Sequence, residues 1–241
     1  MTATVVFFDV AGTLIRVRDG VGVQYARVAG RFGPAPDPKA LEREFPRAFR
    51  AAPPMAFPGA PAEAVPGLER EVWRGIVRDV FAGAGLLAGF GPGAFGAYFD
   101  AVYCHFEDPA TWDVFPDVMP ALSALRALGS PLGVVSNFDS RVLRILEGLG
   151  LSPWFQSVTL SSQVGATKPD RAIFARALAH HGVDAARALH VGDSPVEDCE
   201  GAHAAGLRAV LIDRSGRHAS RPDLVRVDSL AVLADMIRNT G

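Results

Sequence analysis

The first residue in this sequence that could do chemistry is Asp9, which stands at the end of an apolar run. Residues 5–8 are Val, Val, Phe and Phe, and Gly12 breaks the run shortly after the acid. Four consecutive apolar residues are typical of a parallel strand that is covered on both faces. Open α/β sheets bind their ligands at the carboxyl ends of such strands. We therefore expect Asp9 to lie in a functional site.

The lysine content of the chain makes Lys168 a second candidate. The sequence has 24 lysine and arginine residues, but lysine occurs only at positions 39 and 168. In a chain that uses mostly arginine for positive charge, a lysine indicates a position where a guanidinium would not fit. A compact ammonium on a flexible stem fits as a point charge between anionic groups, where a planar guanidinium is too broad.

The third candidate is a turn that carries two acids, Asp193 and Asp198, directly after a strand-like run. Ser194 can cap a following helix and Pro195 suits its first position, which places Asp193 at the mouth of the sheet. Acids in the first turn of a helix are also stabilised by the helix dipole. Glu197 and Asp198 could therefore be merely structural.

Four segments, in this order and spacing, resemble the motifs of the haloacid dehalogenase-like superfamily. They are residues 9–13 against the motif D-x-D-G-T, Ser136-Asn137 after the run 131–135, Lys168 within 165–170, and residues 192–198 against G-D-x-x-x-x-D. The resemblance covers essentially the whole chain. It is strongest to the hydrolases of the subgroup with a helical cap inserted between the first and second motifs.

The resemblance implies a role for each of these residues. Asp9 would attack a phosphate ester and form an aspartyl phosphate, which water then opens. The hydroxyl of Ser136 and the amide group of Asn137 would bind the transferring phosphoryl group. Lys168 would neutralise the charge of the nucleophile and the phosphoryl group.

The resemblance also implies a metal site for Mg²⁺. Oxygen ligands from Asp9 and Asp193, with the main-chain carbonyl of residue 11 and several waters, make a hard site of the kind that magnesium prefers. Asp198 would orient Lys168 or a metal-bound water, a role that could equally belong to Glu197.

One departure from the family pattern affects the expected activity. Ala11 stands where most phosphatases of the family carry a second aspartate, which protonates the leaving group and activates water. General acid/base catalysis usually contributes roughly 100-fold to 10,000-fold, so its loss should slow turnover, most of all on esters with poor leaving groups. Metal binding should survive, because the family uses the main chain at this position. The sequence names no replacement for the missing acid.

Three alternatives to a phosphatase stay open. Alanine at position 11 also resembles phosphonoacetaldehyde hydrolase, which uses a cap lysine, and Lys39 would then need a buried setting although Asp37-Pro38 indicates a helix start. Dehalogenases of the family also attack with aspartate, but they work without metal and carry tyrosine at position 11. The third alternative is a catalytically degenerate phosphate-binding or regulatory protein.

The pattern of apolar segments predicts two domains. Residues 1–16 and 112–241 are expected to form an α/β core with a doubly wound, Rossmann-like and mostly parallel sheet. Residues 17–111 read as helices joined by proline-rich and glycine-rich loops, and are expected to form an inserted helical cap that closes over the site and selects the leaving group. In the helix of residues 68–81, Trp73 belongs to the apolar face and is expected to be structural, whereas Glu69 belongs to the polar face.

Composition excludes several kinds of partner. A formal net charge of −2 gives no electrostatic reason to bind nucleic acid or an anionic membrane, and no apolar stretch is long enough to span a bilayer. The amino terminus shows no signal-peptide pattern, so we expect a cytoplasmic protein, a monomer or homodimer, whose partner is a small phosphorylated molecule. Cys104 and Cys199 are expected to be packed thiols, and His190 a satisfied core residue.

Overall fold

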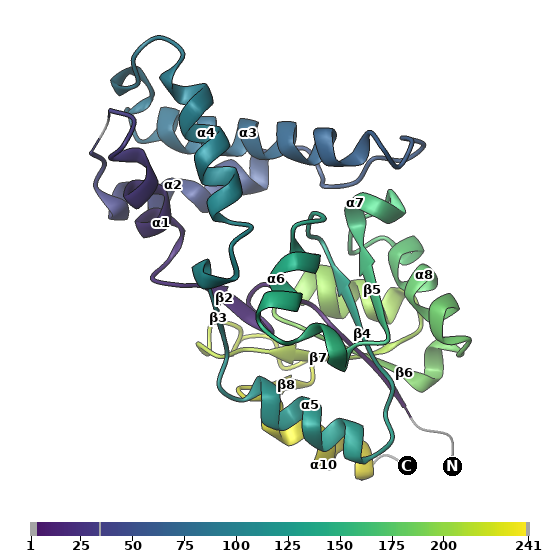
Figure 1. The fold of residues 1–241 in the computed structure, drawn as a ribbon. Coiled ribbons are helices and arrows are strands. Elements are labelled where there is room, and N and C mark those ends of the chain that lie inside the picture. Colours follow the sequence, from purple (N-terminus) through teal and green to yellow (C-terminus); the bar gives the residue numbers. More distant parts are fainter. Residues whose placement is uncertain (1–3, 34, 240–241) are drawn as a thin grey trace.

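The computed structural model describes residues 4–33 and 35–239, and its centre is a six-stranded parallel sheet (Figure 1). The strand order is β5-β4-β1-β6-β7-β8. From β1 the chain adds β4 and β5 on one side and β6, β7 and β8 on the other, which confirms the predicted doubly wound α/β fold. The strands are β1 (Val5–Phe8), β4 (Leu132–Ser136), β5 (Ser157–Leu160), β6 (Ala188–Gly192), β7 (Arg208–Ile212) and β8 (Arg226–Val227).

Helices cover both faces of this sheet, which explains the apolar run in β1. Val6 and Phe8 pack with α5 (Val118–Ala127), α6 (Val142–Gly148) and α10 (Leu233–Arg238). Val5 and Phe7 point to the other face, where they pack with α8 (Arg171–His181) and α9 (Gly201–Ala204). Because all four side chains are at most 1% exposed, neither face of the strand tolerates a polar residue.

Several short elements connect the main ones. α7 (Ser161–Val164) follows β5, and a π-helical turn (Pro195–Glu200) follows β6. The 3-10 helices are Leu87–Gly89, Pro109–Thr111, Ser152–Trp154, Ala185–Arg187 and Leu230–Val232.

The segment between β2 and β3 forms a separate group of helices beside the core (Figure 1). These are α1 (Val21–Ala29), α2 (Pro38–Ala51), α3 (Val65–Gly83) and α4 (Ala94–His105), which we call the cap. The cap has its own apolar core, in which Tyr25, Phe81 and Tyr98 are completely or almost completely buried. All four helices fall within the predicted range 17–111, and the outermost residues of the predicted core ranges, 1–3 and 240–241, lie outside the described residues.

The chain leaves and re-enters the core through a two-stranded antiparallel sheet. β2 (Ile15–Val17) pairs with β3 (Trp112–Val114), with Arg16 opposite Asp113. The sequence analysis did not predict this sheet, because three-residue strands are too short to show a hydrophobic period. The paired strands bring the two connections to the cap side by side.

The two cysteines differ in burial. Cys199 is buried, as predicted, but Cys104 is exposed near the end of α4, so the prediction of a packed thiol is wrong there. The cap core uses the other face of this helix, through Tyr98, Phe99 and Val102. In the described part of the chain no helix is long and apolar enough to cross a membrane.

Asp117 ties the carboxyl-terminal segment to the start of α5. Its Oδ2 accepts hydrogen bonds from Arg214 Nη1 at 2.9 Å, Ser229 Oγ at 3.0 Å and the Leu230 main-chain nitrogen at 2.7 Å. Burial raises the pKa of Asp117, but the hydrogen bonds from Arg214, Leu230 and Ser229 outweigh it and hold the pKa below its ordinary value.

The variant Asp117→Asn is therefore expected to be less stable at pH 7, by about 1–2 kcal/mol in the free energy of unfolding. A lowered carboxyl pKa contributes stability above the unfolded pKa and loses it as the pH falls, so the variant should also lose less stability between about pH 5 and pH 3. Urea unfolding across this range measures both effects. Asp228→Asn is the matched control, since Asp228 makes no hydrogen bond or ion pair with the described residues. Equal pH slopes for wild type and Asp117→Asn would contradict the prediction.

Candidate active site

The carboxyl ends of three neighbouring strands bring the predicted site residues together. Asp9 follows β1, Ser136 ends β4 and Asp193 follows β6, and β1 pairs with both other strands. The main-chain nitrogen of Asp9 donates to Val191 O at 2.9 Å, so the start of the turn is fixed to β6. The residues expected at one edge of the sheet therefore meet there.

Two donors hold one oxygen of Asp9. Ser136 Oγ donates to Asp9 Oδ1 at 2.8 Å, and Lys168 Nζ donates to the same oxygen at 2.7 Å. No hydrogen bond from the described residues engages the second oxygen, Oδ2. The carboxylate is thus oriented through one oxygen while the other keeps its lone pairs.

Lys168 lies between two carboxylates, with its side chain 1% exposed. Its Nζ is 2.6 Å from Asp198 Oδ1 and 2.7 Å from Asp9 Oδ1. Burial lowers the pKa of the Lys168 ammonium, but the charges and hydrogen bonds of Asp198 and Asp9 outweigh it, so the pKa lies above its ordinary value. The ammonium is therefore charged at neutral pH.

Asp198 connects Lys168 to His190, which lies in the core. Burial raises the pKa of Asp198, but Lys168 and the hydrogen bond from His190 hold it well below its ordinary range. Burial lowers the pKa of His190, so its ring is neutral at pH 7 and Nε2 donates to Asp198 Oδ1 at 2.8 Å. The prediction of a core histidine is confirmed, but its Nδ1 has no partner in the part of the chain that is described.

The side chain of Asn137 holds the main chain of Lys168. Asn137 Oδ1 accepts from Lys168 N at 2.7 Å, while Nδ2 donates to Lys168 O at 3.0 Å and to Glu197 Oε2 at 3.2 Å. Because the amide side chain is used in this way, a contact from residue 137 to a substrate would come from its main-chain N–H. The side chain positions the lysine instead.

The turn after β6 needs glycine and a helix cap. A Cβ on Gly192 would collide with the Asp198 carboxylate, so this position has no room for a side chain. Ser194 Oγ accepts from Glu197 N at 3.2 Å, which confirms the predicted cap, and Ser194 N donates to Asp198 Oδ2 at 2.9 Å. Backbone geometry and capping together aim Asp193 and Asp198 at Asp9.

Three carboxylates gather at this point. Asp9, Asp193 and Asp198 each offer one oxygen, and these oxygens lie within 4.8 Å of one another. Burial, then the charges of Asp9 and Asp198, raise the pKa of Asp193 to about 7. Asp198 already accepts hydrogen bonds on both oxygens, which leaves Asp9 and Asp193 as the carboxylates with free capacity.

The residues at this point fit a hard divalent cation. The main-chain oxygen of Ala11 accepts no hydrogen bond from the described residues, so it has free capacity as Asp9 and Asp193 do. Oxygen donors of this kind suit Mg²⁺. Gly12 has a φ of 88° and no room for a Cβ against Asp193, so the turn approaches that carboxylate closely.

The loop after Ser136 connects the core to the cap, a contact that the sequence analysis missed. Trp73 Nε1 of α3 donates to Asp139 Oδ2 at 2.6 Å. Glu69, which was predicted on the polar face, is completely buried and accepts from Ser140 N at 3.0 Å and Ser140 Oγ at 2.5 Å. The prediction for Glu69 was wrong because its partner lies on another domain, 71 residues along the chain.

Arg141 completes this contact, which we call the latch (Glu69, Trp73, Asp139, Ser140 and Arg141). Its guanidinium forms two hydrogen bonds with the Asp139 carboxylate, at 2.8 and 2.7 Å, and a third with the carbonyl of Tyr103 on α4, at 3.1 Å. A buried charge without these partners would be costly, so the latch is stable only as a unit.

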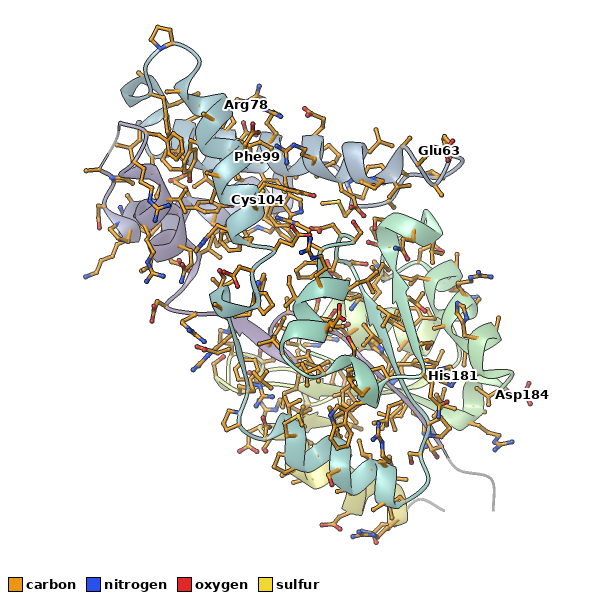
Figure 2. The ribbon with its side chains drawn as sticks, in the orientation of Figure 1. Glu63, Arg78, Phe99, Cys104, His181 and Asp184 are labelled. Atoms are coloured by element: carbon orange, nitrogen blue, oxygen red, sulfur yellow. The ribbon has the colours of Figure 1, made fainter. Side chains whose placement is uncertain are left out.

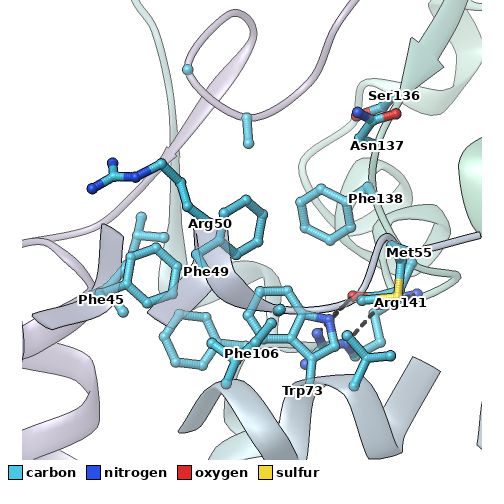
Figure 3. A pocket seen from close by; sticks show the side chains of 18 of the residues that line it. Phe45, Phe49, Arg50, Met55, Trp73, Phe106, Ser136, Asn137, Phe138 and Arg141 are labelled. Carbon is cyan, nitrogen blue, oxygen red and sulfur yellow. Dashed lines mark hydrogen bonds and ion pairs between the residues drawn. The ribbon is translucent and has the colours of Figure 1, made fainter. Parts of the chain in front are cut away.

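A cavity of about 880 Å³ opens between the cap and the site. Its lining includes Asp9, Ala11 and Lys168 of the core and residues of α1, α2, α3 and α4. Figure 3 shows Ser136 on the core side and Trp73 of α3 on the cap side. Lys39 is not part of this lining: it is exposed at the start of α2, where its main-chain nitrogen donates to Asp37. It lacks the buried setting that the phosphonoacetaldehyde hydrolase alternative requires.

Comparisons with known proteins show what this chain is similar to. A family model described as haloacid dehalogenase-like hydrolase matches residues 3–206. Haloacid dehalogenase-like hydrolase domain-containing protein 3 of Danio rerio is 35% identical over 219 residues, which are 91% of this chain and 88% of that protein. Phosphoserine phosphatase of Thermus thermophilus is 36% identical over 113 residues, 46% of this chain and 45% of that protein. The solved structure of a 2-haloacid dehalogenase from Pseudomonas syringae has a TM-score of 0.66 at 26% identity, with 100% of each chain covered.

The latch yields a stability prediction. Trp73→Phe removes the indole donor from the buried Asp139 carboxylate, so the free energy of unfolding in urea should fall by about 1–3 kcal/mol. Trp154→Phe is the matched control, because Arg126 stacks on Trp154 as Arg141 stacks on Trp73, yet its indole nitrogen donates no hydrogen bond among the described residues. The same loss in both variants would show that the Asp139 hydrogen bond contributes nothing.

Proposed function

This chain belongs to the haloacid dehalogenase-like hydrolase family, and from that premise we propose that it is a magnesium-dependent phosphatase acting on a small phosphate monoester through Asp9. The observation that carries the proposal is the shared Oδ1 of Asp9. Ser136 and the Lys168 ammonium both hold this oxygen, while Oδ2 stays free of hydrogen bonds from the described residues.

The reaction follows from this arrangement in two steps. Asp9 Oδ2 forms a bond with phosphorus while the bond from phosphorus to the ester oxygen breaks. The ester oxygen leaves with the electron pair and takes a proton from water to become the alcohol. Water then attacks the phosphorus, the bond to Asp9 breaks, and inorganic phosphate is released. Lys168 and Ser136 hold the nucleophile in place and offset the charge of the approaching anion.

Asp9, Asp193 and the main-chain oxygen of Ala11 are the groups that would hold Mg²⁺. When bound, the cation supplies positive charge against the negative charge of the phosphoryl oxygens. Asp198 keeps Lys168 in position, since both of its oxygens are already engaged by Lys168, His190 and Ser194.

Two observations favour phosphoryl transfer over dehalogenation. Asp193 lies in the same carboxylate cluster as Asp9, and such a pair of acids suits a divalent cation of the kind that phosphoryl transfer uses. Position 11 carries alanine, whereas the dehalogenases of the family carry tyrosine there. The partial match to a phosphoserine phosphatase supports the same choice.

A binding or regulatory protein is the second candidate, and Ala11 is the observation that favours it. Ala11 is exposed in the cavity and offers no proton to a leaving group. The phosphate and metal ligands would then serve recognition, with negligible turnover.

Asp9→Asn is expected to reduce phosphate release to the uncatalysed rate, because an amide cannot serve as the nucleophile. The assay uses p-nitrophenyl phosphate and several metabolite esters with Mg²⁺, and again with excess chelator, which should abolish the wild-type signal. Asp184→Asn is the matched control, because Asp184 is exposed at the far side of α8 (Figure 2). Activity that persists in Asp9→Asn would exclude the proposed nucleophile, and no activity in the wild type would favour the binding protein.

Ala11→Asp is expected to restore the missing proton transfer. The side chain at this position is exposed, so an aspartate fits without disturbing the core. Turnover of an alkyl phosphate should rise by about 100-fold, and that of p-nitrophenyl phosphate much less, because nitrophenolate leaves without a proton. Ala11→Asn, which has the same shape and no titrating proton, should not change the ratio of the two rates. Equal effects of both substitutions on that ratio would refute a vacant acid/base position.

A further inference from the structure

The cavity beyond Asp9 is lined mainly by aromatic side chains of the cap and of the loop after β4. Its volume of about 880 Å³ lies in the range of small-molecule sites and is much larger than one phosphate group needs. The far part therefore has to accommodate the alcohol of the ester. Its aromatic lining includes Phe45, Phe49, Trp73, Tyr103, Phe106 and Phe138.

Three of these rings, those of Phe45, Phe49 and Trp73, contact one another in sequence. Phe49 stacks on Phe45 with ring centroids 5.6 Å apart, and it lies 6.0 Å from Trp73. Phe138 directly follows Asn137, and its ring lies between the Ser136 end of the cavity and Trp73 (Figure 3). A ligand that extends from Asp9 into the cap thus passes Phe138 and reaches the other rings.

Phe49 is 44% exposed although it is a large apolar residue on a helix that packs against the rest of the cap. Part of this exposed ring surface faces the cavity. An apolar group of the ligand would remove that surface from water, which is favourable, whereas a hydroxyl group there would lose its hydrogen bonds to water.

Most charged groups of the cavity wall already have partners. Arg141 binds Asp139 and its guanidinium lies 3.9 Å from the centre of the Tyr103 ring. Glu42 accepts from Gly22 N at 2.6 Å, and Arg16 lies 4.0 Å from Asp113. Such paired groups do not favour a second charged group on the ligand.

Two arginines of the lining have no carboxylate partner among the described residues. Arg50 lies in the last turn of α2, and its guanidinium points away from Phe138 and Trp73 (Figure 3). Arg217 lies in the loop after β7, on the core side, and donates to Ser215. Neither guanidinium lies among the rings of Phe45, Phe49 and Trp73.

We propose that the cavity selects phosphate monoesters whose alcohol carries an aromatic group, which packs between Phe138, Phe49 and Trp73 while the phosphate lies at Asp9. This inference rests on the proposed function, since it assumes that Asp9 receives a phosphate ester. It adds the chemical class of the leaving group, which is apolar and aromatic and not a polyol or a sugar.

The test compares 3-phenylpropyl phosphate with glycerol 1-phosphate. Both leave as primary alcohols, so their chemical reactivity is nearly the same and the difference reports contacts in the cap. With Mg²⁺, kcat/KM for phosphate release is expected to be at least about 10-fold higher for the aromatic ester. Phe49→Ser should reduce this ratio severalfold. Leu68→Ser is the matched control, because Leu68 is a similarly exposed apolar residue of the cap, 38% exposed, that does not line the cavity.

Calorimetric binding separates this inference from the proposed function. In Asp9→Asn with Mg²⁺, 3-phenylpropyl phosphate should bind at least about 10-fold more tightly than glycerol 1-phosphate. If no ester shows Asp9-dependent turnover, the proposed phosphatase is wrong, and the same binding comparison still decides the ligand class. The inference would be overturned if glycerol 1-phosphate bound as tightly as the aromatic ester or more tightly, or if it were turned over faster. It would also be overturned if Phe49→Ser left the ratio of kcat/KM for the two esters unchanged.

Discussion

The site depends on the ion pairs that the buried ammonium of Lys168 forms with two carboxylates. This ammonium is the charged partner of both Asp9 and Asp198, at 2.7 and 2.6 Å, within a cluster that also holds Asp193. One positive charge cannot balance three carboxylates, and burial together with the charges of Asp9 and Asp198 raises the pKa of Asp193 to about 7. An anionic ester would add further negative charge in a poorly solvated place. In the proposed phosphatase, the charges of Asp9, of the cation and of the substrate therefore have to balance one another.

The sequence was sufficient to predict the frame that holds this cluster. Parallel strands buried on both faces are runs of apolar residues, so β1, β4 and β6 could be located, and the side chains that follow them had to meet at one edge of the sheet. α8 begins after the capping side chain of Asp170 and ends at Gly182, because such caps are local signals. Ser194 was predicted as a cap for the same reason. Local capping signals and the ends of the strands were therefore enough to predict where these residues lie.

Contacts between the domains could not be predicted in this way. Glu69 belongs to a helix whose periodicity assigns it to the solvent, but Ser140 of the core satisfies its carboxylate. Asn137 was expected to contact the substrate, yet its side chain holds the main chain of Lys168. Periodicity describes only how a helix packs in general, and it carries no information about a polar partner that is distant in sequence.

The loop of residues 137–141 connects the candidate active site to the cap. Its first residue fixes the main chain of Lys168, and its last three form the latch with Glu69 and Trp73 of the cap. Phe138, between them, faces the cavity. A shift of the cap that broke the latch would separate Trp73 from Asp139 and Glu69 from Ser140, so these buried contacts oppose such a shift. These five residues directly follow Ser136, whose hydroxyl binds Asp9, so one short loop joins the contact at Asp9 to the contacts with the cap.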